Sequence, residues 1–136
     1  MMMLQFTIPI SPVPKGRPRL GKFGTYTPPK TKKFEDDVKL YLNTILKNHD
    51  PLETPIEVFL YFRLPIPKSY SKKRTEACLS GSEKPILKNG DLDNYAKAVL
   101  DAFNGIVYKD DCQIVEMHLT KVYDVKQGID CLIKET

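Results

Sequence analysis

Five aspartates gather in one short part of the chain, between residues 91 and 111. They are Asp91, Asp93, Asp101, Asp110 and Asp111. Carboxylates that lie close together raise one another's pKa unless a cation neutralises them. Oxygen ligands without histidine or cysteine favour a hard ion. A cluster of these aspartates would therefore bind Mg²⁺, with Mn²⁺ as the second choice.

The same aspartates also have an ordinary structural interpretation. Asp93 is well suited to be a helix N-cap, and its spacing from Lys97 would give a weak surface ion pair. Asp110 and Asp111 would then be turn residues. Asp101 lies in the middle of the predicted helix, away from the others, and we assign it to the surface. Spacing alone leaves the metal site and this interpretation both open.

A helix and the strand that follows it must position the aspartates. Apolar residues recur at helical spacing from Tyr95 to Phe103, and Asn104-Gly105 supplies a stop, which predicts a helix over residues 93–104. After it come a short extended piece over 106–108, a turn at 109–111 and an alternating strand over 112–123. If the helix and strand pack side by side, the loop before the helix and the turn before the strand converge. The aspartates of both segments would then crowd together.

The remaining sequence predicts one α+β domain that comprises residues 1–136. Its other predicted elements are a strand over 4–10, a basic loop, a helix over 30–48, a strand over 56–63, a basic loop with a short helix around 71–77, and a last strand over 128–135. The order β-α-β-α-β-β indicates a mixed sheet with helices on one face. The turn at 124–128 predicts that the last two strands pair antiparallel.

Charge and composition indicate which classes of partner and cofactor the protein is expected to have. The net charge is +4, but residues 1–34 contain seven lysines and arginines and no acid, and residues 63–88 are also strongly basic. Such blocks favour a polyanionic partner, although a solvated surface would explain them equally well. No apolar run is long enough to span a bilayer, so we expect a cytoplasmic protein without a membrane partner. No phosphate-cradling glycine motif occurs, so no nucleotide cofactor is expected.

Histidine and cysteine offer no alternative metal site in the sequence. The three cysteines form no C-x-x-C pair, which favours reduced thiols over a disulfide framework or a zinc site. His49 and His118 lie far from each other and from any cysteine at metal-ligand spacing.

Two segments of the chain resemble the RusA family of Holliday junction resolvases. "DLDNYAKAVLDAFNGIVYKDDCQI" is similar to the family's D-x-D-N-x-x-K helix and its following D-D-x-Q-I run, and "PVPKGRPRLGKFGTYTPPKTKKFE" is similar to its N-terminal basic segment. The resemblance implies that Asp91, Asp93 and Lys97 are catalytic. It places the third carboxylate in the Asp110-Asp111 pair, where we favour Asp111. Gly90 replaces the family's usual proline, which predicts a looser approach to Asp91.

What the resemblance implies is a Mg²⁺-dependent endodeoxyribonuclease of the RusA-like fold, which acts as a homodimer on four-way DNA junctions and resolves them by paired symmetric nicks. The ion would activate a water molecule, and Lys97 would stabilise the phosphate. Basic residues would follow the DNA backbone, namely Lys15, Arg17, Arg19, Lys72, Lys73 and Arg74. Two other functions remain open: a non-catalytic nucleic-acid-binding module, and a nuclease for other branched DNA.

Overall fold

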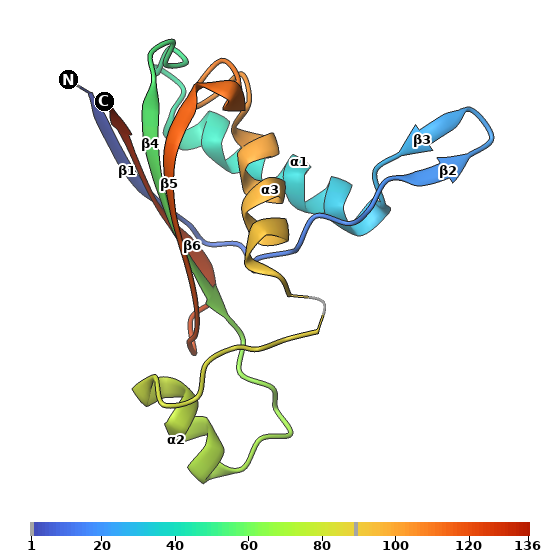
Figure 1. The fold of residues 1–136 in the computed structure, drawn as a ribbon, viewed down its shortest axis with the longest axis vertical. Helices are drawn as coiled ribbons and strands as arrows, with labels where there is room; N and C mark the ends of the chain where they lie inside the picture. Colours follow the sequence, from blue (N-terminus) through green and yellow to red (C-terminus); the bar gives the residue numbers. More distant parts are fainter. Residues whose placement is uncertain (1, 89) are drawn as a thin grey trace.

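A four-stranded mixed sheet forms the centre of the computed structural model, which describes residues 2–88 and 90–136 (Figure 1). Across the sheet the strands are β1 (Met3–Ile8), β6 (Gly128–Glu135), β4 (Ile56–Leu64) and β5 (Ile114–Tyr123). β6 pairs antiparallel with both β1 and β4, whereas β4 and β5 are parallel. The predicted α+β fold with a mixed sheet is confirmed.

Two helices, α1 (Pro29–Ile45) and α3 (Leu92–Phe103), cover one face of this sheet (Figure 1). β4 alternates strictly, and its side chains from Ile56 to Leu64 that face the helices are buried. α3 carries the broader apolar surface, because its alanines and Val99 pack against both the sheet and α1. Burial of this shared core holds α3, and with it the predicted aspartates, against the sheet.

Three smaller elements complete the fold. β2 (Arg19–Gly21) and β3 (Gly24–Tyr26) form an antiparallel hairpin within the N-terminal basic segment. α2 (Lys72–Ser80) begins at the side-chain cap of Ser71 and ends at Gly81, which has a left-handed conformation. A single 3-10 turn, η1 (Asp111–Gln113), precedes β5.

Several predicted elements differ from the structure. The last strand does not pair with β5. Instead β6 inserts between β1 and β4, because its residues Ile129, Cys131 and Ile133 are buried as a central strand requires, whereas β5 lies at the edge with Val115 exposed. Residues 106–108 form a turn with an isolated bridge rather than an extended piece. The β2–β3 hairpin was not predicted, because its two strands are too short to show alternation.

Other sequence predictions hold. The helix that follows the first aspartates is displaced by only one residue, and Gly105 adopts the positive φ expected at its end. All three cysteines are free thiols, with Cys78 and Cys131 buried. Among the described residues no helix is long and apolar enough to cross a membrane.

Candidate metal and nucleic-acid site

The N-terminus of α3 presents two exposed carboxylates, those of Asp91 and Asp93. Asp91 and not Asp93 is the N-cap residue, and it acts through its carbonyl oxygen, which accepts hydrogen bonds from Asn94 N and Tyr95 N at 3.1 Å each. Within residues 2–88 and 90–136, neither carboxylate forms a side-chain hydrogen bond or an ion pair. The carboxylate oxygens of both residues are thus available to a ligand.

Lys97 lies one turn after Asp93 and is exposed on the same face of α3. The predicted surface ion pair between the two side chains is not formed among the described contacts. Lys97 therefore shares a helical face with Asp93 without an ion pair between them in the described part of the chain.

The segment that leads into Asp91 is held by β5. Lys121 Nζ donates a hydrogen bond of 2.8 Å to the carbonyl oxygen of Gly90. Gly90 is buried, and a Cβ atom there would lie 3.1 Å from both Leu87 Cβ and the Tyr95 hydroxyl. The sequence predicted that Gly90 would loosen the approach to Asp91, and the structure shows the opposite arrangement. The absence of a side chain at Gly90 allows close packing, and Lys121 binds the Gly90 carbonyl oxygen. No sequence pattern linked Lys121 to this site.

A hollow of about 380 Å³ joins the acidic and the basic residues at this end of α3. It is lined by the basic segment from Pro14 to Arg17, by Lys88, and by Asp91 and Asn94. The main chain closes it on one side, because Lys15 N donates a 2.8 Å hydrogen bond to Asn94 O. The exposed guanidinium of Arg17 and the carboxylate of Asp91 thus belong to one concave surface.

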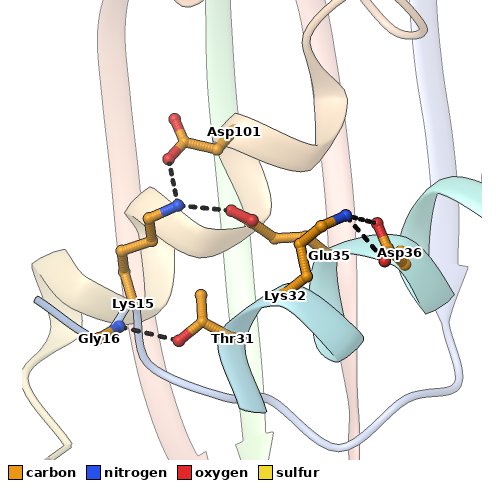
Figure 2. A network of polar contacts seen from close by, with 7 residues as sticks. All are labelled: Lys15, Gly16, Thr31, Lys32, Glu35, Asp36 and Asp101. Atoms are coloured by element: carbon orange, nitrogen blue, oxygen red, sulfur yellow. Dashed lines mark hydrogen bonds and ion pairs between the residues drawn. The ribbon is translucent and has the colours of Figure 1, made fainter. Parts of the chain in front are cut away.

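The side chain of Lys15 forms a largely buried ion triad instead of pointing to solvent (Figure 2). Its Nζ lies 2.7 Å from Glu35 Oε1 and 3.1 Å from Asp101 Oδ2. Burial alone would lower the pKa of Lys15, but the hydrogen bonds to Glu35 and Asp101 outweigh it and leave the pKa raised. The predictions for both residues need revision: Lys15 has no free charge for DNA, and Asp101 is a half-buried partner rather than a surface residue.

The Asp110-Asp111 pair divides into two different environments. Asp110 caps η1: its Oδ2 accepts from Cys112 N at 3.1 Å, and its own N–H donates to Gln113 Oε1 at 2.8 Å. Hydrogen bonds from the Cys112 side chain and backbone lower the pKa of Asp110. Asp111 is exposed and forms no side-chain hydrogen bond or ion pair within the described residues. The carboxylate of Asp111 is thus the freer of the two.

The predicted convergence of Asp91 and Asp93 with the Asp110-Asp111 pair is not seen among the described residues. Asp91 and Asp93 lie at the start of α3, whereas Asp111 begins η1, which follows the other end of the helix in the chain. η1, which begins at Asp111, contacts α3, and the nearby Tyr108 hydroxyl donates a hydrogen bond of 2.7 Å to Leu100 O of that helix. Over the described ranges, Asp91, Asp93 and Asp111 do not form a group whose ligand atoms all lie within 4.8 Å.

One other group does meet that distance in the described part of the chain: Glu57, Glu116 and His118. It lies on the face of the sheet opposite α3, where His118 stacks on Phe59 with ring centroids 4.3 Å apart. His118 Nε2 is 2.9 Å from Glu57 Oε2 and 3.3 Å from Glu116 Oε1. The sequence could not reveal this group, because it depends on the parallel register of β4 and β5.

The remaining predicted DNA-contacting residues are exposed, with one restriction. Arg17 lies just before the β2–β3 hairpin, and Arg19 is the first residue of β2. Lys72 and Lys73 lie in the first turn of α2. Arg74 is exposed, but its Nε donates to Glu83 Oε1 at 2.9 Å and its guanidinium stacks 3.6 Å from the centroid of Tyr70.

Comparison with known proteins adds two findings. The sequence model of a family described as "Endodeoxyribonuclease RusA" matches residues 9–134. The chain is also 35% identical over 141 residues to a Bacillus subtilis (strain 168) protein named "Uncharacterized protein YqaN". That alignment covers 97% of this chain and 96% of the Bacillus protein. The family match includes every residue of the hollow and both ends of α3.

Proposed function

Because the chain belongs to the RusA endodeoxyribonuclease family, we propose that it is a Mg²⁺-dependent endonuclease that resolves four-way DNA junctions by paired nicks. The observation that carries this proposal is the shared hollow at the start of α3. There an exposed arginine, an exposed lysine and the carboxylate of Asp91 line one surface. Cations alone would bind phosphate, and the carboxylate beside them supports a metal-assisted reaction on that phosphate.

The proposed metal ligands are Asp91, Asp93 and Asp111. Their donors are all carboxylate oxygens that are exposed and unpaired within the described residues, which fits Mg²⁺ or Mn²⁺. When bound, the ion would lower the pKa of a water molecule and stabilise charge on the phosphate. Asp111 must come closer to the Asp91–Asp93 pair on binding than it lies in this structure. Asp110 is the weaker candidate, because its carboxylate already caps η1.

The protein's own cations have separate roles in this proposal. Lys97 lies on the same face as Asp93 and is free to contact the scissile phosphate. Arg17, Arg19, Lys72 and Lys73 would contact the backbone on either side. Lys15 has a positioning role instead, because its main chain and side chain together hold the basic segment against α3.

Paired cuts in a junction require two reactive sites, so we propose a two-fold homodimer. A four-way junction is itself close to two-fold symmetric, and two identical sites would reach equivalent phosphates on opposite strands.

Single aspartate variants test the assignment. Asp91→Asn should abolish Mg²⁺-dependent nicking of a synthetic junction while junction binding stays equal or tightens, because a ligand and a charge that repels phosphate are both removed. The matched control is Asp36→Asn, an exposed α1 aspartate whose partner is Lys32. Nicking by Asp91→Asn at the wild-type rate would show that the site is misassigned.

Two alternatives predict other outcomes in the same assay. A non-catalytic module would bind branched DNA and never nick it at any metal concentration. A nuclease for other branched DNA would depend on Asp91 equally but would prefer flaps or three-way junctions in a substrate panel.

A further inference from the structure

The β2–β3 hairpin extends away from the body of the molecule (Figure 1). Its register pairs Arg19 with Tyr26, Leu20 with Thr25 and Gly21 with Gly24. No residue of either strand is buried. A two-stranded hairpin without a packed face is marginally stable in water, so its apolar residues have no evident role in folding.

Large apolar side chains nevertheless lie on this hairpin. Phe23 at the tip is 95% exposed, and Leu20 is 86% exposed. Gly24 has φ of +111°, a conformation that glycine adopts without strain, and the tight turn between Gly21 and Gly24 holds Phe23 at the outermost point. Such exposure of a phenylalanine and a leucine in a projecting element indicates a contact surface.

The charge around the tip identifies the kind of partner. Lys22 Nζ lies 5.7 Å from the centroid of the Phe23 ring, and Arg17 and Arg19 follow the approach to the hairpin. No acidic residue occurs before Glu35. Aromatic rings combined with cations and no acids are typical of surfaces that bind unpaired nucleotides, where bases stack on the rings and cations neutralise the phosphates.

We infer that the hairpin recognises the branch point of its DNA substrate, with the Phe23 ring stacked on a branch-point base that has lost its stacking neighbour and with Arg19 and Lys22 at the flanking phosphates. This inference rests on the proposed function. Bases at a branch point lose a stacking neighbour, so an exposed ring gains contacts there that a continuous duplex does not offer.

The hairpin is also connected to the acidic site by a short segment that packs against the start of α1. Gly16 N donates a 3.0 Å hydrogen bond to Thr31 Oγ1, and a Cβ atom at Gly16 would lie 2.9 Å from Pro28 Cγ. Arg17 lines the hollow that contains Asp91, and β2 begins two residues later. The position of the hairpin on the branch point would therefore determine how far from it the nick is made.

Substitutions at the tip test the inference in the full-length protein. Phe23→Ala should weaken binding to a four-way junction about fivefold to a hundredfold in EDTA, the range typical of one lost base–aromatic stack, and leave affinity for a linear duplex within about twofold. Phe23→Trp should retain junction binding. The control is Leu40→Ala, an exposed apolar residue of α1 that is 71% exposed. Fluorescence anisotropy measures both affinities, and 2-aminopurine at the branch point reports stacking.

Each outcome is informative. Equal junction affinity for Phe23→Ala and the wild type would overturn the inference, as would an equal loss on junction and duplex. A change in sedimentation without a change in DNA affinity would show that the tip contacts a second copy of the chain instead. Because binding is measured in EDTA, the inference can fail while Asp91-dependent nicking persists. Conversely, tip-dependent junction binding without nicking at any metal concentration would refute the nuclease proposal alone.

Discussion

Replacement of Lys15 by methionine should reveal how the basic segment is held against α3. The ammonium group bridges Glu35 and Asp101, with side-chain exposures of 15%, 10% and 29% for the three residues. Methionine keeps most of the apolar stem and removes only the charge. The variant leaves the buried Glu35 without a cation, and two charge-assisted hydrogen bonds are not made.

The magnitude follows from this burial. Removal of one partner from a fully buried pair costs about 3–5 kcal/mol, and the partial exposure of Asp101 reduces that to about 2–3 kcal/mol here. For a chain of 136 residues this corresponds to a fall in Tm of about 6–15 °C. Lys32→Met is the matched control, because Lys32 and Asp36 are more than half exposed and such a surface pair contributes little to stability.

The effect should also depend on pH in a defined direction. The pKa of Lys15 is raised above its ordinary value of 10.5, so its contribution is complete below that pH and is lost as the pH rises through the higher folded value. Urea unfolding should therefore show a stability gap between wild type and Lys15→Met that is constant near neutrality and narrows once the pH rises above 10.5. Adding Glu35→Gln should recover about 1 kcal/mol. If Lys15→Met is no less stable than Lys32→Met, the triad has no structural role.

Further variants test individual contacts of the site. Lys121→Met removes the hydrogen bond to Gly90 O. We expect this variant to nick more slowly and to bind the junction with unchanged affinity. Full activity in single-turnover assays would exclude a positioning role for Lys121. Asp110→Ala removes the η1 cap, so it should lower the urea midpoint of unfolding while nicking is retained. Asp111→Asn should instead abolish nicking and leave that midpoint nearly unchanged. Charge reversal at Arg17 or Lys73 should weaken junction binding and reduce the slope of log affinity against log salt concentration. An unchanged slope would show that the residue does not contact DNA.

Local sequence patterns predicted the helix and strands that carry the site more accurately than they predicted how these elements are arranged. The helical spacing from Tyr95 to Phe103 and the Asn104-Gly105 stop defined α3 to within one residue, because these signals depend only on near neighbours. The position of β6 depends on which strand needs two apolar faces, a property of the assembled sheet. That is why the sequence assigned the wrong partner to the last strand.

The same distinction applies to the site residues. Asp91 and Asp93 could be found from spacing and resemblance, since both lie in one helical turn. The ion triad joins Lys15 to residues 20 and 86 positions further along the chain, and Lys121 reaches Gly90 from another element. No periodic pattern encodes contacts of that kind, so Lys15 was assigned to DNA and Lys121 was overlooked.

The central claim is metal-dependent resolution of a junction, and it is tested most directly by mapping nicks in a synthetic four-way junction with all four strands labelled. With Mg²⁺ the wild-type protein should produce two symmetric nicks in opposite strands, with ends that a ligase can rejoin, and with EDTA it should produce none. Intact strands with Mg²⁺ and Mn²⁺ alike, under conditions where the protein binds the junction, would contradict the account.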